Sequence, residues 1–314
     1  MKITVLDGFA VNPGDLDWGI IGQYGELDVY DRTADDQEAI SRIQDSEVVM
    51  VNKTPLPASV LENAPKLKLV CVLATGYNVV DCDAAKRLGI TVCNVPCYGT
   101  AAVAQFTIAL LLELCHHVGR HDVLVHQGAW TSCQDFCLWT TPQMELAGKT
   151  LGIIGYGRIG QATAAIARAL GMEVIAFNRS PKEDVQTVSL EELLRRSDVV
   201  SLHCPLFPET EGIISRENIA KMKDGALLIN TARGALIDEQ AVADALVSGK
   251  LRGAAVDVAT VEPMRKDNPL LSAPNCLITP HMAWAPLESR RRLLNTVADN
   301  VRCYLEGKPQ NVVN

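Results

Sequence analysis

Short apolar runs alternate with amphipathic segments from the N-terminus of this chain almost to its end. In the first third, apolar runs of strand length occupy residues 3–6, 48–51, 67–73 and 90–95. The helical patterns between them cover residues 37–44, 57–63 and 80–88, and Gly89 supplies a C-terminal cap to the last. Strands that alternate with crossover helices indicate a parallel sheet, so we expect a small doubly wound domain of about five strands.

A second alternating run follows a long apolar helix over residues 100–118. Ser189 and Glu192 form a capping box, Ser215 and Asp238 are N-cap candidates, and Gly249 ends the helix that begins near Asp238. A last helix is expected over residues 286–306. The strands of this run are expected at residues 151–154, 173–177, 198–203, 226–230, 253–258 and 276–279. Six strands in this order predict a complete Rossmann sheet.

Residues 128–147 have no clean hydrophobic period, although they contain Trp130, Phe136 and Trp139. A loop of this length with large aromatic side chains is unusual in a compact domain. We therefore expect this loop either to pack against a second subunit or to cover an active site.

Three glycines at the start of the second run fit the pattern G-x-G-x-x-G. Gly155 allows a tight turn out of the first strand, and Gly157 lets a pyrophosphate approach the backbone. Gly160 lets the following helix, expected over residues 158–170, pack closely on the strand, and the N-terminus of that helix faces the phosphates. Because the motif follows a strand and opens a helix, it predicts a dinucleotide site.

The end of the second Rossmann strand indicates which nicotinamide cofactor is bound. An NAD-selective domain has an acid there for the ribose 2′-hydroxyl, but this chain has Asn178, Arg179 and Ser180. Asn178 can hydrogen-bond a ribose, and Arg179 with Ser180 can hold a 2′-phosphate. We favour NADP over NAD on this pattern; an ordinary exposed arginine in a turn is the alternative.

Composition and charge exclude several classes of protein. The 314 residues are 48% hydrophobic and have a formal net charge of −8, which argues against a nucleic-acid or anionic-membrane partner. The basic cluster at residues 290–292 is interpreted as a solvated helix face, and the most apolar helix, residues 106–114, is too short to span a bilayer. Ten scattered cysteines without a zinc-finger spacing or a secretory signal predict reduced thiols in the cytoplasm and no metal site.

Polar side chains follow three strands of the second run. Arg233 lies in the turn 230–234, Glu262 follows the fifth strand, and His281 follows the sixth. A single histidine is usually structural and a single glutamate is usually solvated. The carboxyl edge of such a sheet binds ligands. Because Arg233, Glu262 and His281 are all expected on this edge, beside a dinucleotide site, together they indicate catalysis.

With these motifs, the chain resembles the D-isomer-specific 2-hydroxyacid dehydrogenases. The matching segments are residues 74–81 (ATGYNVVD), Val103-Ala104 with Thr107, residues 155–160 (GYGRIG), residues 203–206 (HCPL) with Thr210, residues 230–234 (NTARG), Asp257-Val258 with Glu262-Pro263, and residues 279–281 (TPH). Within that family, residues 52–56 (NKTPL) and 136–139 (FCLW) look most like glycerate dehydrogenases and hydroxypyruvate reductases. Glu262 argues against a formate dehydrogenase, which has glutamine there, and the chain ends without the regulatory domain of long phosphoglycerate dehydrogenases.

The resemblance implies a role for each catalytic candidate. Arg233 would bind the substrate carboxylate and the reacting oxygen, and His281 would be the acid in ketone reduction. Glu262 would hold His281 and favour its protonated form. The substrate-binding candidates are Thr75 and Gly76, through their main-chain N–H groups, and Lys53, for which a surface lysine is an equal alternative.

The resemblance also implies the cofactor contacts and the domain arrangement. Residues 99–285 would form a Rossmann NAD(P)-binding domain inserted into a smaller, flavodoxin-like substrate domain of residues 1–98 and 286–314, with a hinge that closes a cleft between them. The cofactor-binding candidates are Thr107, Gly155, Gly157, Arg158, Ile159, Gly160, Asn178, Arg179, Ser180, Cys204, Thr210, Thr231 and Asp257.

The expected function is an NAD(P)-dependent reductase of a small 2-keto acid, with hydroxypyruvate/D-glycerate or glyoxylate/glycolate as the substrate pair. A D-lactate-type dehydrogenase for a larger 2-keto acid is the alternative within the class. A non-catalytic, NAD(H)-sensing protein like the corepressors that share this fold is the alternative outside it. We expect a homodimer, in which Trp139 either reaches the neighbouring active site or packs in the subunit contact.

Overall fold

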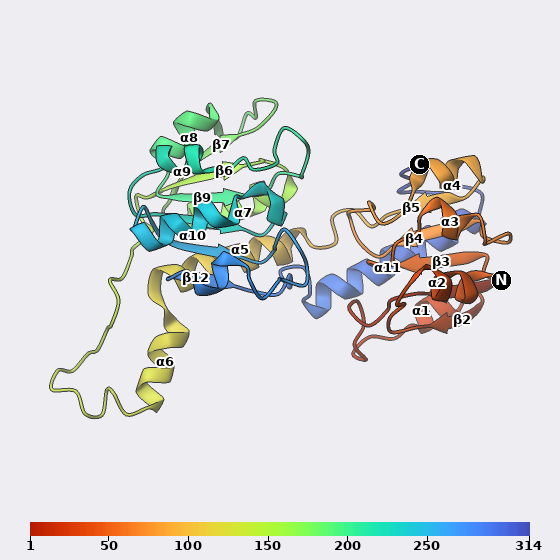
Figure 1. The fold of residues 1–314 in the computed structure, drawn as a ribbon, viewed down its shortest axis with the longest axis horizontal. Coiled ribbons are helices and arrows are strands. Elements are labelled where there is room, and N and C mark those ends of the chain that lie inside the picture. The colour runs from red at the N-terminus through yellow and green to blue at the C-terminus, as the bar shows by residue number, and fades with distance from the viewer. The chain divides into compact units, whose positions relative to one another are not determined.

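The computed structural model describes residues 1–314, which form two compact units. Unit 1 consists of Met1–Gly99 and Trp284–Asn314, and unit 2 consists of Thr100–Ala283. Figure 1 shows a parallel sheet with flanking helices in each unit. The polypeptide leaves unit 1 after its fifth strand and returns to it for the last helix, so the second unit is an insertion.

Unit 1 contains a five-stranded parallel sheet in the order β2-β1-β3-β4-β5. Its strands are β1 (Lys2–Val5), β2 (Glu26–Val29), β3 (Val48–Val51), β4 (Leu69–Val72) and β5 (Thr91–Cys93). The helices are α1 (Gly19–Gly22), α2 (Asp36–Ile43), α3 (Ala58–Leu61), α4 (Cys82–Arg87) and α11 (Leu287–Leu305). This strand order is the flavodoxin-like one, so the predicted fold of the smaller domain is confirmed.

Two elements of unit 1 escaped the sequence patterns. The edge strand β2 has the sequence ELDV and no buried residue, so it lacks the apolar run that identifies the other four strands of the sheet. Helix α1 is a single turn, which is too short for a periodic pattern. The strand β2 is secured by pairing with β1, and α1 by packing against α11 and β2, rather than by their own sequences.

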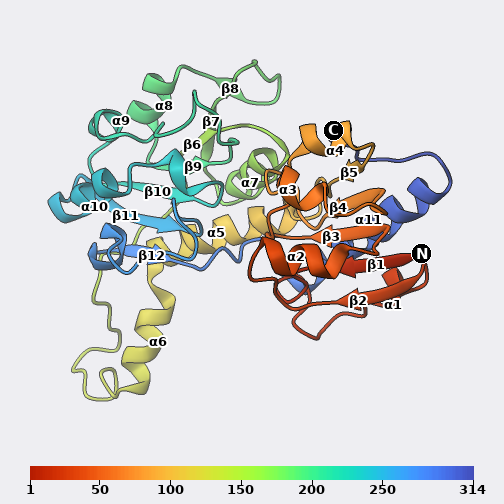
Figure 2. The same cartoon turned by 45° about the vertical axis from the view of Figure 1, so that its right-hand side comes forward.

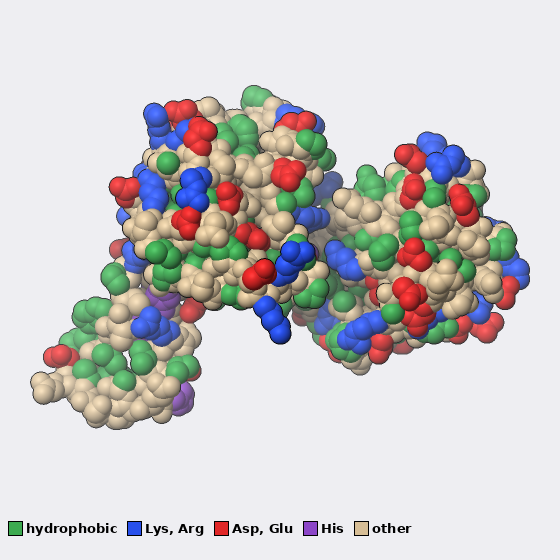
Figure 3. All heavy atoms as spheres, viewed as in Figure 1, with side chains coloured by type: hydrophobic (Ala, Val, Ile, Leu, Met, Phe, Trp, Pro, Cys, Tyr) green, Lys and Arg blue, Asp and Glu red, His purple; other side chains and the backbone are tan.

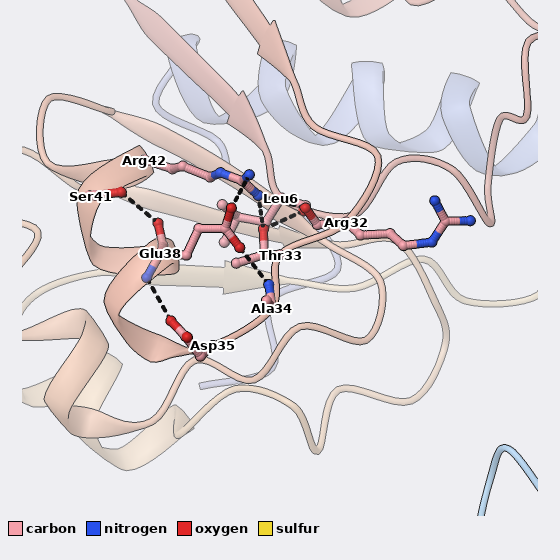
Figure 4. A network of polar contacts seen from close by, with 8 residues as sticks. All are labelled: Leu6, Arg32, Thr33, Ala34, Asp35, Glu38, Ser41 and Arg42. Atoms are coloured by element: carbon pink, nitrogen blue, oxygen red, sulfur yellow. Dashed lines mark hydrogen bonds and ion pairs between the residues drawn. The ribbon is translucent and has the colours of Figure 1, made fainter.

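The start of α2 is fixed by side chains (Figure 4). The Asp35 carboxylate accepts a hydrogen bond from the Glu38 amide (2.9 Å), and the Glu38 carboxylate accepts one from the Ala34 amide (2.6 Å). Arg42 pairs with Glu38 and donates to the Thr33 hydroxyl (2.7 Å). These contacts satisfy the free amides of the first turn and join α2 to the segment after the edge strand β2.

Arg290 on α11 corrects one prediction. It is 7% exposed, and its guanidinium forms two 2.6 Å bonds to the Asp15 carboxylate and a third, of 3.1 Å, to the Val11 carbonyl. The interpretation of residues 290–292 as a solvated face was therefore wrong for Arg290, which is a buried, fully bonded cation. The hydrogen bonds from Arg290 lower the pKa of Asp15.

Unit 2 contains a seven-stranded parallel sheet in the order β12-β11-β10-β9-β6-β7-β8. Its strands are β6 (Thr150–Ile154), β7 (Glu173–Phe177), β8 (Gln186–Thr187), β9 (Val199–Leu202), β10 (Ala226–Asn230), β11 (Leu251–Val256) and β12 (Cys276–Ile278). Six of these were predicted; β8 has only two residues and no apolar run. The order is the Rossmann arrangement with one added edge strand, which confirms the predicted fold class.

Three helices of unit 2 begin, and one of them ends, where the capping residues predict. The helices of unit 2 are α5 (Thr100–His116), α6 (Val118–His126), α7 (Arg158–Ala169), α8 (Leu190–Arg196), α9 (Arg216–Lys221) and α10 (Glu239–Ser248). Ser189, Ser215 and Asp238 each accept an amide hydrogen bond as N-caps, and Gly249 ends α10 with a left-handed backbone. The capping box is only half formed, because Glu192 pairs with Arg196.

The long apolar helix is shorter than predicted. It ends at His116, His117 takes a left-handed backbone (φ 48°), and the chain bends into α6. No single helix is long and apolar enough to cross a membrane; the pair α5 and α6, bent by 55°, passes that test together, by length and composition only. Figures 1 and 2 both show α6 and the following loop projecting from the sheet of unit 2.

The projecting segment, defined here as residues 118–147, has an unusually apolar surface. Helix α6 has no buried residue, and Trp130, Phe136 and Trp139 are 50%, 90% and 64% exposed. Figure 3 shows hydrophobic side chains exposed on it, beside a few acidic, basic and histidine side chains. The loop after α6 therefore has no core of its own to bury its aromatic residues.

Candidate active site

The glycine turn after β6 has the geometry that a pyrophosphate requires. Gly155 has a φ of 95°, and a Cβ there would lie 2.5 Å from the Cys204 amide nitrogen. At Gly160 a Cβ would lie 2.5 Å from the Gly155 carbonyl oxygen. At Gly157, by contrast, a Cβ would meet nothing within 4 Å, so the backbone there is open to a ligand at the N-terminus of α7. The turn therefore fits a dinucleotide, with Arg158 and Ile159 in the first turn of α7.

The segment after β7 is joined to the glycine turn. The Asn178 side chain accepts a hydrogen bond from the Tyr156 amide (3.1 Å) and donates one to the Ser180 carbonyl (2.8 Å). Arg179 and Ser180 are exposed at the carboxyl end of the strand. Their position suits a ligand, and the guanidinium would be the charge partner of an anion there.

Four further cofactor candidates have side chains that are hydrogen-bonded or buried within the protein. The hydroxyls of Thr107 and Thr231, both buried, lie 2.9 Å apart and join α5 to the end of β10. The Thr210 hydroxyl accepts the Phe207 amide (2.8 Å) and so closes the turn 205–210. Burial raises the pKa of the Cys204 thiol to about 11, which keeps it neutral. These four side chains are uncharged, so they shape the site and do not form ion pairs with a ligand.

His203 lies between β9 and the glycine turn, and the mechanism expected from the sequence gave it no role. Its Nε2 is 2.9 Å from the Ser201 hydroxyl, and burial lowers its pKa from 6.5 to about 4. A histidine with such a pKa is neutral throughout the neutral pH range. His203 is therefore a packing residue behind Gly155.

Asp257 organises the turn that presents His281. This carboxylate is 1% exposed and accepts hydrogen bonds from the Thr279 hydroxyl (2.6 Å) and from the amides of Met282 (2.9 Å) and Ala283 (2.8 Å). The His281 amide in turn donates to the Asp257 carbonyl (2.7 Å), and His281 has a left-handed backbone (φ 51°). The buried Asp257 carboxylate therefore defines both sides of the turn that presents His281.

Glu262 and His281, between which the family resemblance implied a hydrogen bond, lie within hydrogen-bonding distance of each other. Nδ1 of His281 lies 2.7 Å from Oε2 of Glu262, and their side chains are 30% and 36% exposed. The second carboxylate oxygen of Glu262 accepts the Ala259 amide (3.1 Å). Because a carboxylate can only accept here, the imidazole hydrogen is on Nδ1, and Nε2 is the atom that can exchange a proton with a substrate.

Arg233 lies in a turn that packs against the turn of Glu262. The Asn230 side chain closes its own turn, donating to the Arg233 carbonyl (2.8 Å) and accepting the Ala232 amide (3.1 Å). Gly234 approaches the other turn so closely that a Cβ would lie 1.9 Å from the Ala259 carbonyl carbon. The structure thus brings the segments of Arg233, Glu262 and His281 together on one edge of the unit 2 sheet.

Unit 1 holds the three substrate-binding candidates on two loops. The Asp7 carboxylate accepts the amides of Asn52 (2.7 Å), Lys53 (2.5 Å) and Thr54 (2.7 Å), and so fixes the loop of Lys53. Thr75, next to Gly76, donates its hydroxyl to the Val95 carbonyl (2.9 Å). Asp7 escaped sequence reasoning, although its position directly after β1 was a usable signal.

Comparisons with known proteins identify the family of this chain. Residues 108–283 match the model of the D-isomer specific 2-hydroxyacid dehydrogenase, NAD binding domain. The chain is 57% identical to a hydroxypyruvate reductase of Blautia hydrogenotrophica, over 100% of both chains, and 41% identical to a glycerate dehydrogenase of Methylorubrum extorquens, over 99% of this chain and 98% of that protein. A solved acyclic imino acid reductase in complex with NADPH and D-arginine is 34% identical over 100% of both chains, with a TM-score of 0.87. This chain belongs to the D-isomer-specific 2-hydroxyacid dehydrogenase family.

Proposed function

We propose that this protein reduces a small 2-keto acid to the D-2-hydroxy acid with a nicotinamide cofactor, and that its substrate is hydroxypyruvate or glyoxylate. The observation that carries the proposal is the 2.7 Å pair of His281 and Glu262 beside the turn of Arg233. The full-length similarity to a hydroxypyruvate reductase and a glycerate dehydrogenase supports the substrate class. The reverse reaction, oxidation of D-glycerate or glycolate, uses the same groups.

Each side chain of this edge has a chemical task in the reduction. Arg233 binds the substrate carboxylate and stabilises the negative charge that develops on the carbonyl oxygen. The bound nicotinamide supplies the hydride to the carbonyl carbon. His281 gives a proton from Nε2 to the carbonyl oxygen, and Glu262 holds the ring through Nδ1 and compensates its positive charge. Unit 1 contributes, in this proposal, the amides of Thr75 and Gly76 and the ammonium group of Lys53.

A nicotinamide cofactor follows from the family, and we propose that NADPH is preferred to NADH. Residues 178–180 have no acid for a ribose 2′-hydroxyl, and Arg179 is exposed beside the glycine turn. The related imino acid reductase solved with NADPH supports this preference. In Arg179→Gln, the ratio of kcat/KM for NADPH to that for NADH should fall roughly tenfold, because the phosphate loses its charged partner. A clear preference of the unaltered protein for NADH would contradict the proposal.

The decisive experiment is a turnover assay with hydroxypyruvate, glyoxylate, pyruvate and a branched 2-keto acid, each with NADPH and NADH. We expect the highest kcat/KM with hydroxypyruvate or glyoxylate. In His281→Ala, kcat should fall by roughly two to four orders of magnitude while NADPH binding, followed by its fluorescence, survives. Tight cofactor binding without turnover of any 2-keto acid would instead identify a nucleotide-sensing protein. A preference for the branched acid would indicate a larger substrate.

We also propose that the protein is a homodimer that buries the projecting segment. Trp130, Phe136 and Trp139 lie exposed on it, and a second copy would remove their apolar surface from water. Sedimentation velocity of the unaltered chain and of a variant with Phe136→Glu tests this assignment. The unaltered chain should sediment as a dimer and the variant as a monomer, and a monomeric unaltered chain would refute it.

A further inference from the structure

Tyr156 occupies an unexpected place within the glycine turn. It stands between Gly155 and Gly157, yet it is 0% exposed and packs in a hydrophobic core of unit 2. Its phenol hydroxyl donates to Asp184 Oδ2 (3.0 Å). A tyrosine in such a place normally needs a partner for its hydroxyl, and this partner lies on the segment between β7 and β8.

Both ends of that segment are tied to Tyr156. At one end, Asn178 accepts the Tyr156 amide (3.1 Å), and at the other, Asp184 accepts the Tyr156 hydroxyl. Between them, residues 179–183 are exposed and belong to no helix or strand. Apart from the Ser180 carbonyl, which accepts from Asn178 (2.8 Å), and the Lys182 amide, which donates to the Thr187 hydroxyl (3.3 Å), the segment is held by the bonds at its two ends.

A cation on α7 completes the cluster. The Arg168 guanidinium donates to the Asp184 carbonyl (2.9 Å), and both of its terminal nitrogens lie 3.4 Å from the Tyr156 hydroxyl oxygen. Burial, which is the largest cause, raises the pKa of Tyr156, so the phenol keeps its hydrogen at neutral pH. The hydroxyl thus donates to Asp184 and can accept from Arg168, and it links the glycine turn, α7 and residues 178–184.

We propose that Tyr156 is a positioning residue that holds residues 178–184 in the conformation that binds the adenosine ribose, and so contributes to the choice between NADPH and NADH. The inference rests on the proposed binding of the cofactor at this edge. Arg179 lies on the segment, one residue from Asn178, and the location of its guanidinium follows the segment. Loss of the tether at Asp184 would let the segment move away from the 2′-phosphate, whereas the pyrophosphate and nicotinamide contacts would remain.

The test is the dissociation constant of each cofactor for Tyr156→Phe, measured by titration of nicotinamide fluorescence without substrate. The substitution keeps the buried ring and removes only the hydroxyl. We expect the Kd of NADPH to rise roughly three- to tenfold, as for the loss of one hydrogen bond, and the Kd of NADH to rise less. The kcat at saturating NADPH should change by less than about twofold, because the tether does not touch the reacting atoms.

Matched variants separate the tether from a general loss of structure. Asp184→Asn keeps an oxygen acceptor and should bind NADPH nearly as the unaltered protein does, whereas Asp184→Ala should reproduce Tyr156→Phe. Tyr304→Phe on α11 removes a phenol hydroxyl from unit 1 and should change neither Kd. Should Tyr156→Phe fail to fold, Asp184→Ala breaks the same bond from its exposed side.

Unchanged Kd values for Tyr156→Phe and Asp184→Ala would overturn the proposal. Equal rises for both cofactors, together with a lower melting temperature, would also overturn it, since they indicate only a loosened domain. The binding measurement needs no turnover. If the proposed reaction is wrong, only the turnover assays with the 2-keto acids will show it. If the proposed role of Tyr156 is wrong, only the titrations of cofactor Kd will show it.

Discussion

Nδ1 of His281 lies 2.7 Å from Oε2 of Glu262, and each residue is also bonded to the turn that follows β11. The His281 amide donates to the Asp257 carbonyl (2.7 Å), and the other carboxylate oxygen of Glu262 accepts the Ala259 amide (3.1 Å). The imidazole is thus held at its ring and at its backbone by one turn. A proton can leave or reach Nε2 without reorientation of the ring, as acid–base catalysis requires.

Glu262→Gln tests the contribution of the carboxylate. The amide keeps the length of the side chain but loses the charge that compensates a protonated His281. We expect kcat with hydroxypyruvate to fall roughly tenfold or more, with the Kd of NADPH unchanged. The exposed Glu288→Gln on α11 is the control and should behave as the unaltered protein. A kcat for Glu262→Gln within about twofold of the unaltered value would show that the pair is structural.

Arg233→Lys separates the charge of the guanidinium from its geometry. Lysine keeps one positive charge but cannot bind a carboxylate through two parallel hydrogen bonds. The KM for the 2-keto acid should therefore rise roughly tenfold or more, and kcat/KM should fall by at least the same factor, measured by initial rates at saturating NADPH. Because Asn230 closes the backbone of this turn, the fold should be unaffected, and circular dichroism checks this. Equal KM values for the two proteins would remove Arg233 from the carboxylate site.

Asp7→Asn tests whether the loop of Lys53 serves the substrate. Asp7 accepts three consecutive amides, and an asparagine offers one acceptor oxygen instead of two, so at least one amide loses its partner. We expect a loss of roughly 1–3 kcal/mol in the free energy of unfolding of unit 1. We also expect a several-fold higher KM for the 2-keto acid.

The control for Asp7→Asn is Asp17→Asn, since Asp17 also accepts a backbone amide, that of Gly19 (2.7 Å), in an exposed turn. It should leave the KM for the 2-keto acid unchanged. Chemical denaturation and initial rates provide both readouts, and the Kd of NADPH should be unaltered in either variant. An unchanged KM for Asp7→Asn would mean that the loop of Lys53 is only structural.

The elements that could be predicted from the sequence are those whose determining interactions are local. The glycine turn, the N-caps Ser189, Ser215 and Asp238 and the inner strands are each specified by a few neighbouring residues. The alternation of strands and helices then left few topologies, because crossover connections in parallel sheets have one hand. Both predicted sheet types are therefore present in the structure.

The remainder depends on contacts between residues far apart in the chain. Arg290 is buried because Asp15, 275 positions away, pairs with it, and no window of the sequence reveals that partner. The edge strand β2 is defined by its pairing with β1. Likewise, the contact between the Tyr156 hydroxyl and Asp184 depends on the pairing of β7 with β6, which brings the two segments together. The residue types indicated which side chains to propose for the site, but they did not reveal the hydrogen bonds that support them.

His203 predicts a pH dependence of stability in unit 2. Burial lowers its pKa from 6.5 to about 4, so the unfolded chain binds more protons than the folded one between these values. The stabilisation is complete above pH 6.5 and is lost progressively as the pH falls towards 4, by at most about 3 kcal/mol.

The comparison is between the unaltered protein and His203→Gln, in denaturant titrations at pH 8 and pH 5. At pH 8 the variant should be the less stable, because its side chain fits the site less well. At pH 5 the difference should shrink, since only the unaltered protein has a histidine to protonate there. The other five histidines are common to both chains and cancel. Equal losses of stability for the two proteins between pH 8 and pH 5 would exclude His203 as the source.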